Sequence, residues 1–252
     1  MTPAARERMQ IRVAVLLISA AAWIFLVLEP GAMTVSTLCP EGMESMASGA
    51  SFKMLMGAFR PVPLIAYWVV MTLAMMTPLM VAPLSHIYYR SLARRRAMMI
   101  QLFAASYAAI WVIAGIILVP VLIASRWLIS SSPASAASFV FVALVWQLSP
   151  AKQKCLNRSH YHSPLAAFGI QANRDAICFG LSHGAWCVGS CWALMLLPLA
   201  FSRFHLLAMA AITLWLVAER LETPVAPRWR WRGPAKALRI LCMQTQIRLQ
   251  RT

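Results

Sequence analysis

Six apolar stretches divide this chain of 252 residues, and their lengths limit its possible folds more than any other feature. They cover residues 12–28, 62–88, 97–125, 136–150, 176–200 and 204–221. A helix of about 20 apolar residues crosses the hydrocarbon core of a bilayer. Hydrophobic residues make up 61% of the chain, whereas soluble domains contain roughly 45–50%. The pattern predicts an all-α, polytopic membrane bundle of about six transmembrane helices. The first stretch is longer than a signal-peptide core and no convincing cleavage site follows it, so we expect a retained helix.

The basic residues lie mostly on one side of these stretches. Of the 23 Lys and Arg residues, 19 precede the first stretch, follow the sixth, or lie between the second and third or the fourth and fifth. The positive-inside rule then places both termini in the cytoplasm. Because the net charge of +16 is arranged in this way, it predicts contact with anionic lipid headgroups and not with nucleic acid.

The same pattern divides the chain into two parts. We expect a transmembrane helical domain over residues 1–222, with an outer loop at 30–60, and a basic cytoplasmic tail over 223–252. In the tail, leucines mark one side of a possible helix and Arg and Lys occupy the rest. This arrangement is typical of an amphipathic helix that lies at the membrane interface.

The fifth stretch carries the residues with the clearest chemistry. His183, Cys187, Cys191 and Met195 are spaced four apart, so in a helix they form one row. Imidazole, thiol and thioether groups are ligands for soft metals, above all Cu(I). The alternative is that both cysteines are small apolar residues that let helices approach beside Gly184 and Gly189.

Methionines in the second stretch provide further candidate ligands. They are Met71, Met75, Met76 and Met80. Their thioethers are neutral and can lie at lipid depth while still binding a soft ion, although methionine also fills gaps between helices. Pro78 frees a backbone carbonyl one turn earlier and bends the helix. Because the second and fifth stretches cross in opposite directions, Met75 and Met76 are expected at the depth of the two cysteines.

Two more groups of residues suggest places where a metal enters or leaves. The outer loop contains Cys39, Met43 and Met46, which form a possible capture site for a soft cation. The alternative for this loop is a surface segment with a short amphipathic helix. The inner segment contains Cys155, His160 and His162, which form a possible receiving site. Its neighbouring basic residues could instead simply contact headgroups.

The remaining stretches offer little chemistry. The third provides small packing positions at Ser106 and Gly115. No Asp or Glu is expected inside a span, since Glu219 lies at the end of the sixth stretch. This absence argues against a carrier that uses intramembrane carboxylates and against a zinc site.

Three motifs resemble a known family. They are Trp68-x-x-Met71 with Met75-Met76-x-Pro78, then Gln147-Leu-Ser-Pro150-x-Lys152-x-x-Cys155-Leu156, and then Gly184 through Met195. Together they are similar to bacterial proteins described as predicted metal-binding integral membrane proteins, over roughly residues 60–222. The resemblance implies a multi-span helical protein of the bacterial inner membrane that binds metal and has no established reaction. Ser190 stands where the family has a cysteine, and Ser159 and His160 stand where it tends to have His and Cys.

Together these features favour a membrane protein that binds copper for transfer, transport or homeostasis. A metal-delivering or metal-receiving protein is the expected partner. One alternative is a non-catalytic subunit or assembly factor of a larger membrane complex. Another is a membrane thiol oxidoreductase, although thiols four apart on a helix have parallel Cβ vectors and would form a strained disulfide. We identify no catalytic residue and no organic cofactor site.

Overall fold

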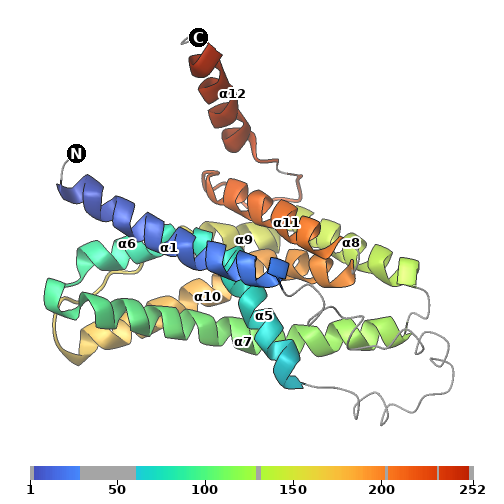
Figure 1. Cartoon of the computed structure of the whole chain (residues 1–252), viewed down its shortest axis with the longest axis horizontal. Coiled ribbons are helices and arrows are strands. Elements are labelled where there is room, and N and C mark those ends of the chain that lie inside the picture. Colours follow the sequence, from blue (N-terminus) through green and yellow to red (C-terminus); the bar gives the residue numbers. More distant parts are fainter. Residues whose placement is uncertain (1–2, 29–60, 129–131, 202–203, 232, 250–252) are drawn as a thin grey trace.

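The computed structural model describes residues 3–28, 61–128, 132–201, 204–231 and 233–249 (Figure 1). All regular secondary structure in these ranges is helical, as the sequence predicts. The elements are α1 (Pro3–Leu28), α5 (Pro61–Met76), η1 (Thr77–Met80), α6 (Val81–Arg90), η2 (Ala93–Arg95), α7 (Arg96–Leu128), α8 (Ser132–Leu148), α9 (Pro150–Ser159), α10 (Gly169–Ala200), α11 (His205–Arg220) and α12 (Ala235–Leu249).

Four segments of the described chain are long and apolar enough to cross a membrane, which indicates a multi-pass membrane protein. They are Met9–Leu28, Pro63–Arg90, Ala93–Leu122 and Gly169–Ala200. The fourth and sixth predicted spans correspond to shorter helices. In α8 the apolar part is Ala136–Leu148. Helix α11 has 16 residues, so it is about 24 Å long, compared with a hydrocarbon core of about 30 Å.

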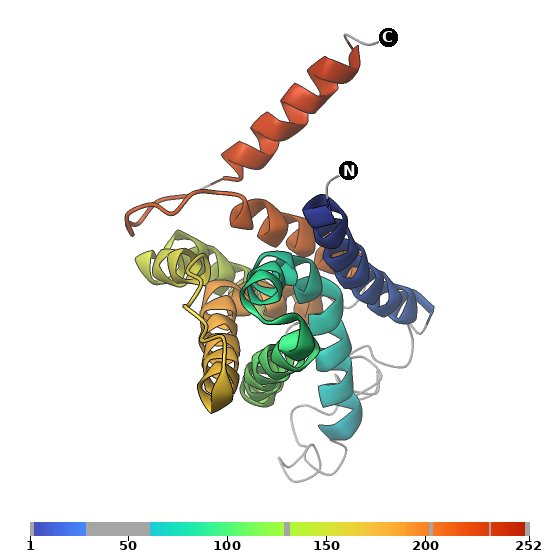
Figure 2. The same cartoon turned by 90° about the vertical axis from the view of Figure 1, so that its left-hand side faces the viewer.

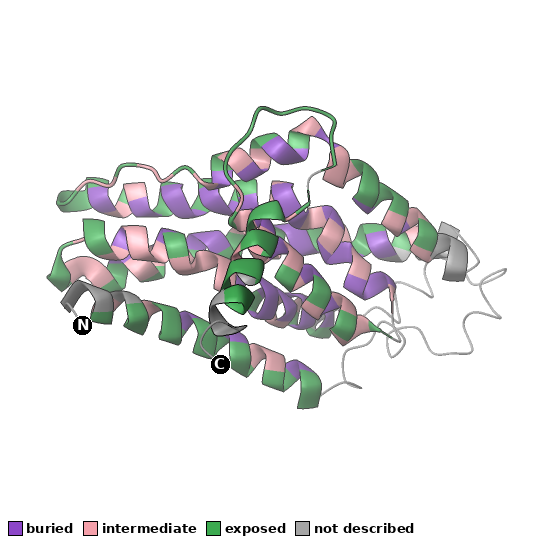
Figure 3. Ribbon diagram, turned by 90° about the horizontal axis from the view of Figure 1, so that it is seen from above, coloured by how far each residue is buried: buried purple, intermediate pink, exposed green. Residues whose placement is uncertain are grey.

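Helices α7 and α10 form the centre of the bundle and run side by side in the same direction (Figures 1 and 2). Gly180 of α10 lies against Phe103 and Ser106 of α7, and Gly184 lies against Ile110. Side chains at these glycines would meet the facing helix, so their absence permits the close approach. Buried residues concentrate along the facing sides of the central helices, while the outer surfaces are exposed (Figure 3).

Pro78 interrupts the second span, as predicted. The short 3₁₀ segment η1 separates α5 from α6, and the chain changes direction there (Figure 1). Since proline has no N–H, the carbonyl of Ala74 loses its helical partner. Helix α1 provides replacements: the Ser19 hydroxyl donates to this carbonyl at 2.8 Å, and Trp23 Nε1 donates at 3.2 Å. The bend therefore becomes the docking point of α1.

The fourth apolar stretch is part of a longer helix. Helix α8 begins at Ser132, ahead of the stretch at 136–150. Alanine favours helices, and Pro133 is tolerated in a first turn. The helix ends as predicted before Pro150. There the Ser149 side chain accepts a hydrogen bond from the Lys152 backbone N–H at 3.1 Å and caps α9.

The basic tail forms the predicted helix. It is α12, which projects away from the bundle (Figures 1 and 2). The described side chains of α12 are exposed or half-buried. Its helical nature is therefore observed, and its position at a membrane interface stays a prediction.

Candidate metal centre

The row of four side chains predicted on the fifth stretch lies inside the protein. The exposed fractions are 4% for His183, 1% for Cys187, 1% for Cys191 and 0% for Met195. Other faces of α10 carry exposed apolar residues such as Trp186. The row therefore faces neighbouring helices and not the outside of the bundle.

Both cysteines are free thiols held by short local interactions. The Cys191 thiol donates to the backbone carbonyl of Cys187 at 3.0 Å. The Tyr107 hydroxyl of α7 donates to the Cys187 sulfur at 3.3 Å. The sequence did not reveal Tyr107 as part of this site, because we treated the third stretch only as a packing helix.

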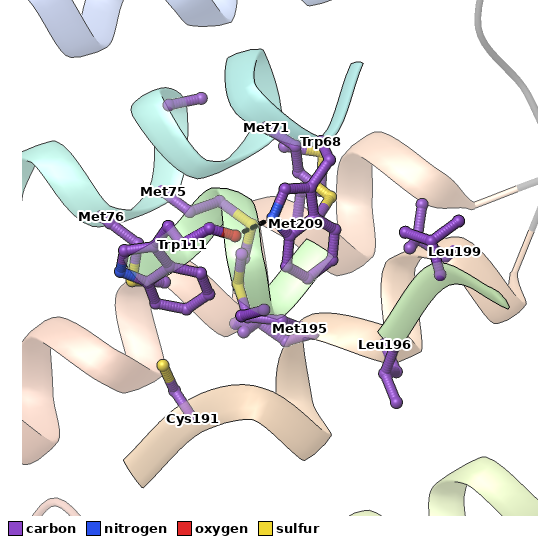
Figure 4. Close-up of a cluster of buried hydrophobic side chains, with 14 of the residues drawn as sticks. Trp68, Met71, Met75, Met76, Trp111, Cys191, Met195, Leu196, Leu199 and Met209 are labelled. Atoms are coloured by element: carbon purple, nitrogen blue, oxygen red, sulfur yellow. Dashed lines mark hydrogen bonds between the residues drawn. The ribbon is translucent and has the colours of Figure 1, made fainter. Parts of the chain in front are cut away.

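The thiols and most of the predicted thioethers belong to one buried cluster (Figure 4). It contains Cys187, Cys191, Met71, Met75, Met76 and Met195, together with Met209 of α11, which the sequence did not single out. Met80 is half-buried and packs at the edge of this cluster. The two thiols, Met195 and the buried methionines of the second span therefore belong to the same core.

Two tryptophans link α5 with α7. Trp68 of α5 donates its indole N–H to the carbonyl of Trp111 on α7 at 2.7 Å, and their rings lie 6.1 Å apart. Helix α5 packs mainly on α1 and α7, whereas α10 packs mainly on α7. The helices that carry the thioethers and the thiols are therefore both packed on α7.

Only some of the candidate methionines line a small cavity beside α7. It has a volume of about 110 Å³, and Met76, Met80, Tyr107 and Trp111 are among its lining residues. Tyr107 also contacts Cys187. Met76 and Met80 therefore share a cavity wall with Tyr107, while neither cysteine lines the cavity. The other predicted methionines do not line this cavity.

His183 is enclosed by aromatic rings. The centroids of Phe103, Tyr107 and Phe179 lie 6.1, 6.0 and 5.7 Å from that of the histidine. Its Nδ1 atom is buried and has no hydrogen-bond partner in the described structure. An unpaired buried nitrogen is costly in an apolar environment, and a lone pair of this kind suits a metal.

A buried ion pair lies at the end of α11, where the sequence places Glu219. Glu219 is buried and accepts hydrogen bonds from Gln147 and from Trp215 Nε1. Lys152 Nζ lies 2.5 Å from its carboxylate. Burial lowers the pKa of Lys152, and the carboxylate of Glu219 partly opposes this effect.

Arg220, the next residue of α11, points toward the same region. Its Nη1 donates to the Ser159 carbonyl at 3.4 Å, while its Nη2 is buried without a hydrogen-bond partner in the described structure. The guanidinium also interacts electrostatically with Cys187 and Cys191. A sequence signal existed, because a Glu-Arg pair ends the otherwise apolar helix α11, but only the fold shows which residues lie near the pair.

The three residues predicted as an inner receiving site do not come together. Cys155 packs against Gly189, whose missing side chain makes room for the sulfur. Both ring nitrogens of His160 lie near backbone carbonyls, those of Leu156 at 2.8 Å and Arg220 at 3.1 Å. The ring of His162 instead contacts other aromatic rings. Neither nitrogen of His160 is therefore free for a metal.

The described residues contain no group of three or more His, Cys, Asp or Glu side chains able to hold a metal. His183 therefore does not join both thiols in one such group, and a site at Cys187 and Cys191 would need thioethers as further ligands. Cys39, Met43 and Met46 lie outside the described residues, so the proposed capture site stays a prediction.

A second, larger cavity is separate from the thiol cluster. It has a volume of about 320 Å³ and lies between α8, α9, α11 and the tail. Glu219 and Lys152 line it together with Arg228 and Arg230. None of its lining residues is a cysteine, histidine or methionine, so it offers no ligands for a soft metal.

Comparison with known proteins agrees with the chemistry of the buried row. No curated protein and no solved structure shows significant similarity to the chain. A family model described as "PpoB2: Copper chaperone" matches residues 65–243, which include most of α5, all of α7 and α10, and every candidate ligand within the bundle. The chain therefore belongs to the PpoB2 copper chaperone family.

Proposed function

We propose that this protein holds Cu(I) within the membrane at Cys187 and Cys191 and passes it between protein partners. The observation that carries the proposal is the pair of fully buried thiols on α10 within a methionine cluster. Thiolate and thioether sulfur are the ligands that select Cu(I). Packing alone would be satisfied by any small apolar residue at these two positions.

Met76 is the best candidate for an additional ligand. It lines the small cavity together with Tyr107, which contacts Cys187. His183 lies one turn before Cys187 on the same face and has an unpaired nitrogen. We assign Met71, Met75, Met80 and Met195 to the surrounding sulfur-rich wall, which lets the ion move between alternative ligands.

The charge of the complex also fits the surroundings. Two thiolates and one Cu(I) carry a net charge of −1, which is costly in an apolar interior without compensation. The guanidinium of Arg220 interacts with both cysteines and has an unpaired buried nitrogen. Arg220 is therefore suited to balance the copper-loaded site.

The arrangement of the helices supports six crossings with both termini in the cytoplasm. Helices α7 and α10 run in the same direction, so the chain between them must return across the membrane, and α8 is the apolar helix that lies between them. Helix α11 returns again: His205, at its start, lies near the Pro198 carbonyl at 2.6 Å, and the Arg220 carbonyl, at its end, lies near His160. The basic segments then gather on one side.

Removing both buried thiols tests the proposal. Purified wild-type protein under reducing conditions is expected to retain about one copper ion per chain. The double variant Cys187→Ser, Cys191→Ser should lose this copper, because a neutral hydroxyl is a poor ligand for Cu(I). Elemental analysis of the purified proteins measures the difference.

A matched control removes two other thiols. Cys178 and Cys242 are both exposed, so the double variant Cys178→Ser, Cys242→Ser should keep its copper. If the variant without Cys187 and Cys191 is folded and binds as much copper as this control, the proposed site is wrong.

A further inference from the structure

A pair of histidines lies outside the thiol cluster, at the basic end of the bundle. His86 belongs to α6, and His162 to the segment between α9 and α10. Their ring centroids are 5.0 Å apart and the planes are inclined by 50°. Arg95 binds the Gly169 carbonyl at 3.0 Å near the start of α10. The sequence does not indicate that these two histidines lie together, because 75 residues separate them.

The ring of His86 is oriented by the backbone. Its Nε2 donates to the Ser163 carbonyl at 3.0 Å, so in the neutral ring Nδ1 carries the free lone pair. Histidines that bind metals are commonly oriented in this way through their second nitrogen. The ring of His162 lies 6.1 Å from that of Phe179, measured between centroids.

A continuous series of groups connects this pair with the thiols. Phe179 lies 5.7 Å from His86 and also 5.7 Å from His183, measured between ring centroids. His183 has the unpaired Nδ1 atom and adjoins Tyr107 at 6.0 Å. Tyr107 in turn contacts Cys187. A cation that leaves the histidine pair therefore meets an aromatic face, then an imidazole nitrogen, and then a thiol.

We infer that His86 and His162 form a second, weaker Cu(I) site through which copper is exchanged with the buried thiols. The inference rests on the proposed function of Cys187 and Cys191. Imidazole is a good ligand for copper, and a d¹⁰ ion such as Cu(I) accepts two-coordinate geometry. Neutral imidazoles bind Cu(I) less tightly than two thiolates do, so copper at this pair remains exchangeable.

Titration of the full-length protein with Cu(I), in detergent and against a chromophoric Cu(I) chelator, tests the inference. The wild type should bind about two Cu(I) ions in a tight and a weaker step. The double variant His86→Gln, His162→Gln should lose only the weaker step. A glutamine amide at position 86 can still donate to the Ser163 carbonyl, so the variant removes the ligand nitrogen and preserves the anchor of the segment. His162→Gln alone, which changes only the connecting segment, should also abolish the weaker step.

Two further variants separate this inference from the proposed function. His205→Gln is the control, because His205 is the first residue of α11 and the Arg220 carbonyl near His160 is at the opposite end of that helix. This variant should keep both binding steps. Cys187→Ser, Cys191→Ser should lose the tight step and retain the weaker one. Two intact steps in the folded histidine variants would overturn the histidine site. Two intact steps in the folded cysteine variant would overturn the thiol site and leave the result for the histidines readable.

Discussion

Replacing Glu219 with alanine is expected to lower the free energy of unfolding by about 3–5 kcal/mol, because it leaves a buried lysine without its counterion. Lys152 has an exposed fraction of 4% and lies 2.5 Å from the Glu219 carboxylate. The change also removes the acceptor of Gln147 and Trp215. Thermal or denaturant unfolding of the purified protein in detergent measures the loss.

A double replacement provides the matched control. Lys152→Met combined with Glu219→Leu removes both charges and fills similar volume, and such exchanges are often neutral or stabilising. The double variant should therefore be clearly more stable than Glu219→Ala. Equal stability of the two variants would show that the ion pair is not the source of the effect.

The pH dependence of the Glu219→Ala variant gives an independent check. Burial already lowers the pKa of Lys152, and removing the opposing carboxylate lowers it further. Between that lowered pKa and the ordinary lysine pKa, the unfolded state binds more protons than the folded state. The free energy of unfolding of the variant should therefore rise with pH across this window. Below the lowered pKa of Lys152, the variant should show the full loss of stability.

The second large effect is expected at the tryptophan pair between α5 and α7. Trp68→Ala should cost about 3–5 kcal/mol, the usual range for emptying a buried aromatic position. Trp68 has an exposed fraction of 1%, donates to the Trp111 carbonyl, and its ring fills the space left by Gly115. The shift of the unfolding midpoint in detergent measures the cost.

Two other tryptophan variants define the cause. Trp68→Phe keeps an aromatic ring but loses the indole N–H donor, so its stability should fall between those of the wild type and Trp68→Ala. Trp229→Ala alters a tail residue with an exposed fraction of 68% and should change stability by no more than about 0.5 kcal/mol. A similar loss in Trp229→Ala and Trp68→Ala would contradict the packing described for α5 and α7.

Local rules predicted the helices and their main interruption. Apolar runs report helices in this class of protein because a bilayer leaves the backbone few other ways to satisfy its hydrogen bonds. Pro78 marked the bend because its effect acts on the carbonyl four residues earlier. The row containing Cys187 and Cys191 followed from helical spacing alone. Helical spacing also identified the face of α10 that carries the His, Cys and Met side chains, and that face is buried.

The surroundings of the thiols could not be predicted, because they come from distant segments. Tyr107 lies 80 residues from Cys187, and no periodicity within α7 identifies the helix that it faces. Arg220 approaches the cysteines from the last turn of α11. Proximity in sequence was misleading for Cys155 and His160: Cys155 packs on Gly189, whereas backbone carbonyls surround the ring of His160.

X-ray absorption at the copper K-edge tests the central claim most directly. Protein loaded with a single equivalent of Cu(I) should show a first coordination shell dominated by sulfur, supplied by Cys187, Cys191 and a methionine. The same sample of the Cys187→Ser, Cys191→Ser variant should lose most of that sulfur signal. A first shell of nitrogen and oxygen alone in the wild type would contradict copper binding at the buried thiols.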